Sequence, residues 1–152
     1  MPFTKRLPEV EAAMADAEWE DVSWADGAYW SLLYRLWGEA EGAIIVEHDI
    51  VPTAEDLDGL QTCNREWCVC TYAFEEFGPI WGLGCVKFSP TLMLRTPNAL
   101  ADVARISDEV HPSRHWCSLD VYLQSVLRRA NAVPHVHGEV RHLCPTRSHD
   151  CR

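Results

Sequence analysis

The chain has 152 residues, 47% of them hydrophobic, which is enough for one domain over residues 1–152 with a sizeable core. A formal net charge of −10 argues against broad, nonspecific binding to nucleic acid. No apolar stretch approaches the length of a membrane span, and the N-terminus shows no signal-peptide pattern. We therefore expect a cytoplasmic protein with no membrane partner.

Charges, histidines and cysteines are unevenly distributed. Residues 1–110 contain 7 Lys and Arg against 20 Asp and Glu, whereas residues 111–152 contain 6 Arg against 3 acids and 6 of the 7 histidines. A local anion site therefore stays open, and the C-terminal third would be the place for one. Seven cysteines are an odd number at irregular spacing, which favours reduced thiols over a disulfide framework.

Helical and extended patterns alternate along the N-terminal half. Apolar residues recur at helical spacing over 7–14 and 28–38, and alternation over 19–24 predicts a short strand. The β-branched run at 44–46 predicts a buried strand. Residues 53–56, Thr-Ala-Glu-Asp, resemble a capping box that opens a short helix.

The second half is expected to contain two strands, two helices and a tail. The strands are predicted over 68–72 and 83–88, the helices around 100–104 and over 119–130, and the irregular, His-rich tail from 134 onward. Alternating helices and strands predict an α/β fold in which helices flank a mixed, Rossmann-like sheet.

The strand at 44–46 ends in Glu47-His48-Asp49, two carboxylates one residue apart. Alternation along a strand would put Glu47 and Asp49 on one face and His48 on the other. Two neighbouring negative charges at a buried strand end are unfavourable unless a cation or hydrogen bonds compensate them. A divalent metal carrying a phosphate ligand would compensate them. The alternative is a solvated strand end whose acids cap the next helix.

Four motifs, in this order, resemble the GT-A class of glycosyltransferases. They are Glu47-His48-Asp49, Trp81-Gly82-Leu83-Gly84, Trp116-Cys117-Ser118-Leu119-Asp120, and His135-Val136-His137 with His142. The stretch from Tyr29 into the first motif is also similar to small, phage-type members of that class. The resemblance covers roughly residues 27–143 and implies a compact GT-A-like domain. Only residues 1–4 precede the first helix, so the usual N-terminal strand is shortened or absent.

The resemblance implies a Mn²⁺ or Mg²⁺ site that binds the diphosphate of a nucleotide-sugar donor. Asp49 would be the direct ligand, with Glu47 contacting a ribose or the metal through water. A C-terminal histidine would complete the metal shell, and we expect His137 first and His135 second, with His142 the remaining choice. The metal would act as a Lewis acid toward the departing nucleoside diphosphate.

Four further residues are assigned to the donor. Gly82 and Gly84 would let the backbone approach the sugar, although a bulge or a strand kink explains both glycines equally well. Arg141 could pair with a phosphate oxygen, and Lys5 could meet a phosphate near the shortened strand.

The resemblance makes Asp120 the base that accepts the proton of the acceptor hydroxyl in an inverting transfer. The alternative is a helix-capping carboxylate, whose pKa the backbone N–H groups would lower. Trp116 would be a platform for the acceptor or else a core residue. The acceptor stays open between a hydroxylated DNA base, a small molecule and a protein hydroxyl, and a phage-encoded enzyme would work in the host cytoplasm.

Two other interpretations of the chain remain. Cys63, Cys68 and Cys70, completed by Cys85, Cys117 or the histidines, could hold zinc and make the chain a zinc-stabilised binding module. Cys68 and Cys70 lie in an expected strand, however, where buried free thiols are the commoner outcome. A GT-A-like protein without catalytic activity is the other alternative, because its N-terminal strand is shortened.

Overall fold

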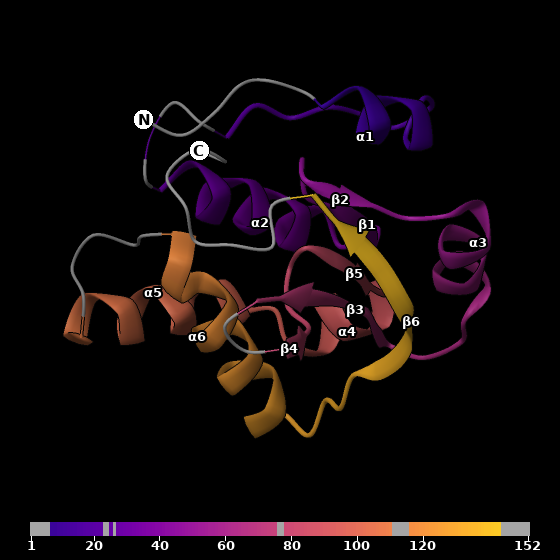
Figure 1. The fold of residues 1–152 in the computed structure, drawn as a ribbon. Coiled ribbons are helices and arrows are strands. Elements are labelled where there is room, and N and C mark those ends of the chain that lie inside the picture. The colour runs from indigo at the N-terminus through magenta and orange to yellow at the C-terminus, as the bar shows by residue number, and fades with distance from the viewer. Residues whose placement is uncertain (1–6, 23–24, 26, 76–77, 111–115, 144–152) are drawn as a thin grey trace.

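The computed structural model is an α/β structure in which helices cover both faces of a mixed sheet (Figure 1). It describes residues 7–22, 25, 27–75, 78–110 and 116–143. Helix α3 lies on one face of the sheet, and α2, α5 and α6 lie on the other. The predicted α/β class and the mixed sheet flanked by helices are confirmed.

The described residues form six helices and six strands. The helices are α1 (Pro8–Ala13), α2 (Ala28–Glu39), α3 (Ala54–Thr62), α4 (Pro90–Arg95), α5 (Ala99–Val110) and α6 (Trp116–Arg129). The strands are β1 (Ala43–Val46), β2 (Ile50–Val51), β3 (Trp67–Phe74), β4 (Gly78–Ile80), β5 (Cys85–Phe88) and β6 (His135–His142).

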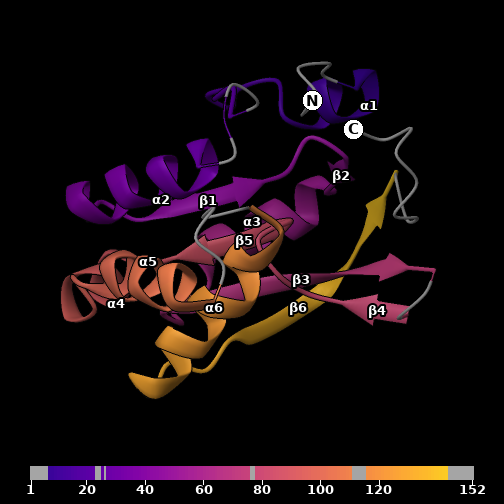
Figure 2. The same cartoon turned by 90° about the vertical axis from the view of Figure 1, so that its left-hand side faces the viewer.

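The strand order is β1-β5-β3-β6-β2, with β4 paired to the end of β3. Strand β5 is antiparallel to both β1 and β3, whereas β6 is parallel to β3. The far end of β6 pairs with β2, where Ile50 faces His142 and Val51 faces Arg141. Figure 2 shows β6 crossing the sheet toward β2, so this one strand connects two separate regions of the molecule.

Strand β3 supplies the sheet's two cores through its alternating side chains. Trp67 and Val69 join the larger core under α2, α5 and α6, whereas Cys68, Cys70 and Tyr72 join the smaller core under α3. All five side chains are buried, which a strand covered on both faces requires.

Helix α3 begins as its sequence predicts. The Thr53 hydroxyl accepts the Asp56 backbone N–H at 3.1 Å, and the Asp56 carboxylate accepts the Thr53 N–H at 2.8 Å. This reciprocal capping satisfies two backbone donors that the helix itself leaves without partners. Helix α3 ends at Thr62, which puts Cys63 at its C-cap.

Two of the expected elements differ from the structure. The tail from 134 onward, expected to be irregular, contains the eight-residue strand β6. Its side chains are largely exposed or half-buried, so it lacks the apolar alternation by which a strand is recognised. The strand expected over 19–24 is not formed over 19–22, the part of that range that the structure describes.

Candidate functional site

Two carboxylates lie in the turn that joins β1 to β2, and a third approaches them from α6. Glu47 and Asp49 follow β1, and Asp120 belongs to α6. We call these three residues the acid cluster. The Ile50 N–H donates to the Glu47 carbonyl at 3.1 Å, and the Glu47 N–H donates to the Gly84 carbonyl at 2.9 Å. The turn, and not the alternation of a continuing strand, therefore positions Glu47 and Asp49.

The surroundings of the acid cluster disfavour the charged forms of Glu47 and Asp120. Burial raises the pKa of Glu47 to about 8, with further contributions from the charges of Asp120 and Asp49. Burial also raises the pKa of Asp120 to about 6, although a hydrogen bond from the Leu83 N–H opposes that shift. The net direction is opposite to the lowering expected for a helix-capping carboxylate.

Gly82 and Gly84 belong to the turn that precedes β5, and they place its backbone directly against Asp120 and Tyr72. A Cβ on Gly82 would lie 2.6 Å from Asp120 Oδ2, and a Cβ on Gly84 would lie 2.8 Å from the Tyr72 ring. The Leu83 N–H between them donates to Asp120 Oδ1 at 2.8 Å. The two glycines therefore make room for side chains of this chain, which explains them without a bound donor.

Two tyrosines complete the surroundings of the acid cluster. Burial raises the pKa of the Tyr29 hydroxyl, and so do the charges of Glu47 and Asp120. Burial and the same two carboxylates also raise the pKa of Tyr72. Tyr29 Oη is buried beside Glu47 without completing a hydrogen bond of ordinary geometry. The cluster thus contains a polar group that is not fully satisfied.

His142 is the histidine that the fold brings to Asp49. Its Nε2 lies 3.2 Å from Asp49 Oδ2, and its Nδ1 lies 2.9 Å from the Ala73 carbonyl oxygen. Burial alone would raise the pKa of Asp49, but the bond to His142 and the charges of His48 and His142 leave that pKa lowered. Burial alone would lower the pKa of His142, but its bonds to Asp49 and Ala73 raise it.

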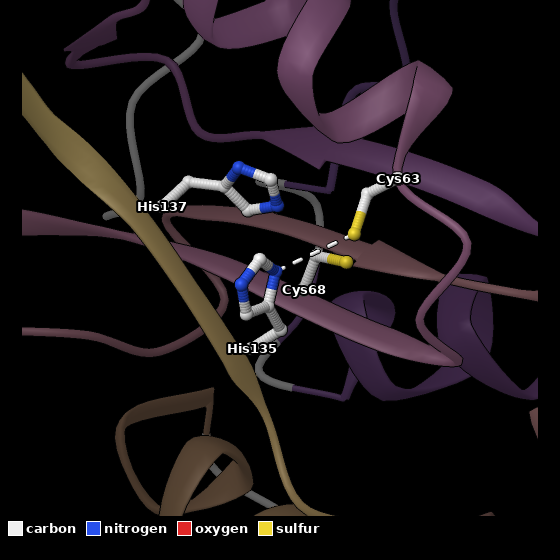
Figure 3. A group of neighbouring side chains, drawn as sticks. All are labelled: Cys63, Cys68, His135 and His137. Carbon is white, nitrogen blue, oxygen red and sulfur yellow. Dashed lines mark hydrogen bonds between the residues drawn. The ribbon is translucent and has the colours of Figure 1, made fainter.

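His135 and His137, the two histidines expected at the metal, lie elsewhere. Seven residue steps separate His135 from His142 along β6, a span of about 23 Å. Both instead approach Cys63 and Cys68, and the ligand atoms of these four residues all lie within 4.8 Å of one another (Figure 3). We call these four residues the thiol–imidazole cluster. The structure therefore does not unite His135 or His137 with Glu47 and Asp49.

The remaining expected residues have less defined surroundings. Arg141 is exposed on β6, directly before His142. Lys5 and the side chain of Trp116 lie outside the described residues. A cavity of about 10 Å³ lies beside Asp120, lined in part by Trp67 and Trp81. That volume is close to the minimum for one water molecule, so this cavity cannot hold a sugar.

The chemistry of the acid cluster fits a hard divalent cation. Carboxylate oxygens are preferred ligands of Mg²⁺ and Mn²⁺, and imidazole is accepted by Mn²⁺. A metal-binding histidine characteristically donates its other ring N–H to a carbonyl, which is the position of His142 Nδ1 against Ala73. Asp49 and His142 would hold the ion, with Glu47 close by. Among the described residues, however, only the thiol–imidazole cluster is a group of three or more such side chains whose ligand atoms already lie within 4.8 Å of one another.

The sequence left several of these neighbours unassigned. Tyr29 and Tyr72 lie in ordinary apolar patterns, and nothing local shows that both hydroxyls point to the acid cluster. Their approach depends on how α2 and β3 pack, which sequence spacing does not encode. His142 was one of three candidate histidines, and only the register of β6 against β2 distinguishes it.

No family model, curated protein or solved structure that was compared with this chain matches it. Within the residues that the structure describes, none of the helices has the length and apolar character needed to span a bilayer.

Proposed function

We propose that the protein is a metal-dependent glycosyltransferase that moves a sugar from a nucleotide-sugar donor to a hydroxyl acceptor. The observation that carries this proposal is the meeting of Asp49 with His142, beside Glu47 and Asp120, at one edge of the sheet. These residues come from a turn, a helix and the last described strand, so only the folded chain brings them together.

The donor site consists of Asp49, His142 and Glu47. Asp49 and His142 would hold Mn²⁺ or Mg²⁺, and Glu47 would contact either the donor ribose or, through water, the ion. When bound, the ion supplies Lewis acidity that neutralises charge on the departing nucleoside diphosphate. Arg141 is exposed one residue from His142 and is the candidate for pairing with a phosphate oxygen.

The proposed transfer is inverting, with Asp120 as the base. The bond between the anomeric carbon and the diphosphate oxygen breaks, and its electron pair leaves with the diphosphate. The acceptor oxygen forms the new bond to the anomeric carbon and gives its proton to Asp120. The hydrogen bond from the Leu83 N–H fixes Asp120 Oδ1, which leaves Oδ2 as the oxygen for that proton.

The acceptor class is the least constrained part of the proposal. A hydroxylated DNA base follows from the similarity to phage-type enzymes, and the chain's net charge of −10 disfavours it. A small-molecule hydroxyl agrees better with that charge. Transfer assays with both acceptor classes at low and physiological salt would distinguish them.

Donor binding is the first test of the proposal. The purified chain would be heated with each member of a panel of nucleotide sugars, with and without Mn²⁺. A ligand that binds only the folded state raises the melting temperature, and we expect a rise that needs both Mn²⁺ and one nucleotide sugar. Asp49→Asn should abolish that rise, whereas the exposed neighbour variant His48→Ala should keep it.

Asp120→Asn tests the base separately. We expect this variant to keep the donor-dependent rise and to lose 10²-fold or more of its transfer rate, on the order of what a positioned base contributes. Full transfer by Asp120→Asn would remove Asp120 from this role. If no donor shifts the melting temperature of the wild-type chain, the protein is not a glycosyltransferase, and the non-catalytic or zinc-module interpretation takes its place.

A further inference from the structure

The thiol–imidazole cluster lies apart from the acid cluster and has no part in the proposed transfer. Its four ligand atoms belong to Cys63, Cys68, His135 and His137, and they lie within 4.8 Å of one another. We propose that these four side chains form a structural Zn²⁺ site that ties the end of α3 and the start of β3 to β6.

The spacing of the ligand atoms is close to what tetrahedral zinc requires. With Zn–S near 2.3 Å and Zn–N near 2.0–2.1 Å, neighbouring ligand atoms lie about 3.3–3.8 Å apart. The Cys63 sulfur is already 3.4 Å from His135 Nδ1. The remaining contacts need at most about 1.5 Å of contraction from the 4.8 Å limit, which side-chain rotation can supply.

An unsatisfied atom inside the cluster independently points to a ligand. His137 Nε2 is buried and has no hydrogen-bond partner in the structure. Burying a polar atom without a hydrogen-bond partner costs free energy. In Figure 3 the His137 ring points toward the sulfur atoms of Cys63 and Cys68. A metal bond to Nε2 would satisfy it.

The backbone brings all four ligands together, although the register of the β3–β6 ladder shifts between Val69 and Thr71, next to His137. Cys63 is the C-cap of α3, and Cys68 follows five residues later in β3. His135 is the parallel partner of Cys68 across the β3–β6 ladder. His137 is two residues further along the same strand, and its ring centroid lies 4.6 Å from that of His135, so both rings project from the same face. A His-x-His pair is thus suited to a strand, as a His-x₃-His pair is suited to a helix.

Two thiolates and two imidazoles select Zn²⁺ over Mg²⁺ and Mn²⁺, which prefer oxygen. Four protein ligands fill the tetrahedron, and such closed sites stabilise folds and leave no position for a substrate. Lys87 adds a nearby positive charge, since its ammonium donates to the Cys63 carbonyl oxygen. That charge favours the two thiolates.

Zinc content of the full-length chain is the direct test. Purified protein, desalted after exposure to excess Zn²⁺, should retain one zinc per chain by elemental analysis. Cys63→Ser and His137→Ala should lower that content at least five-fold. Cys70→Ala removes a buried thiol from the same face of β3, outside the cluster, and should keep one zinc. His135→Cys exchanges one ligand for another and should also keep it.

Cobalt provides a second measurement on the wild-type chain, in case a variant fails to fold. Apo protein titrated with Co²⁺ should develop thiolate-to-cobalt charge-transfer bands and the intense ligand-field absorption of tetrahedral cobalt, saturating at one equivalent. Stoichiometric Zn²⁺ should bleach both.

Three results would overturn the proposal. These are less than about 0.1 zinc per wild-type chain with no cobalt spectrum, unchanged zinc content in both Cys63→Ser and His137→Ala, or a Cys63–Cys68 disulfide in freshly purified protein. None of them bears on Mn²⁺ and donor binding at Asp49, so this proposal and the proposed transfer can fail separately.

Discussion

The acid cluster and the thiol–imidazole cluster lie at opposite ends of β6 and differ in the softness and completeness of their ligands. At the His142 end, three carboxylates meet, and burial raises the pKa of two of them. At the His135 end, two thiols and two imidazoles have their ligand atoms within 4.8 Å of one another. An incomplete set of oxygen ligands suits an ion that exchanges together with substrate, and a complete set of thiolates and imidazoles suits a permanently bound ion. One strand therefore connects a proposed reaction site to a proposed structural anchor.

Loss of the zinc anchor should have the largest effect on stability. If zinc is present at about 1,000 times its dissociation constant, removing it costs on the order of 4 kcal/mol of unfolding free energy. Cys68→Ala should therefore lower the melting temperature by about 10 °C, measured by circular dichroism with zinc present. Cys70→Ala is the matched control, because it truncates an equally buried thiol of the same strand face. Equal losses in both variants would mean that Cys68 is only a packing residue.

Gly82→Ala should disturb the acid cluster by steric overlap alone. Its added Cβ would lie 2.6 Å from Asp120 Oδ2 and 3.0 Å from Tyr72 Oη. We expect a loss of about 1–3 kcal/mol in denaturant unfolding, together with weaker donor binding and unchanged zinc content. Gly38→Ala, in α2 with nothing within 4 Å of its added Cβ, should instead be neutral or stabilise by up to about 1 kcal/mol. A tolerated Gly82→Ala would show that Asp120 and Tyr72 have room to move.

Glu47→Gln should stabilise the metal-free chain at alkaline pH. The pKa of Glu47 is about 8 in the fold against 4.5 for a free carboxyl, so the native state binds the extra proton between these values. The free energy of unfolding of the wild-type chain therefore falls as pH rises through that window. The Glu47→Gln variant does not lose this stability, because its amide does not ionise. We expect a gain on the order of 2 kcal/mol at pH 8–9 that vanishes near pH 4.5.

The matched control for that variant is Glu41→Gln, which neutralises an exposed carboxylate. It should change stability little across the same pH range. A Glu47→Gln variant that is less stable than wild type at pH 9 would show that the acid cluster carries no repulsion.

Thr53→Ala should have the smallest effect and separates stability from site integrity. Removing the hydroxyl that accepts the Asp56 N–H should cost about 1 kcal/mol in denaturant unfolding. Helix α3 leads from β2 to Cys63, yet zinc content and donor binding should both persist. Loss of zinc content or of donor binding in Thr53→Ala would mean that the start of α3, and not only its end, holds the corresponding site in place.

The sequence predicted those elements whose stabilising contacts join residues close together in the chain. The capping box at Thr53 and Asp56 is confirmed, because both partners of its hydrogen bonds lie within four residues. Strand β6 was missed, because its pairing with β3 is parallel and nonlocal and its side chains lack an apolar face. The positions of the histidines depend on the same nonlocal pairing. Only the placement of β6 between β3 and β2 sends His135 and His137 to the cysteines and His142 to Asp49.

Manganese binding to the zinc-loaded chain tests the division between the two ends of β6 most directly. Free Mn²⁺ gives a six-line paramagnetic resonance spectrum that weakens when the ion binds to a protein. In the presence of the nucleotide sugar that stabilises the chain, we predict one bound Mn²⁺ per wild-type chain, none in Asp49→Asn, and one in Cys70→Ala. Zinc content should stay at one in all three. Manganese bound equally by wild type and Asp49→Asn, or bound only after zinc is removed, would contradict the account.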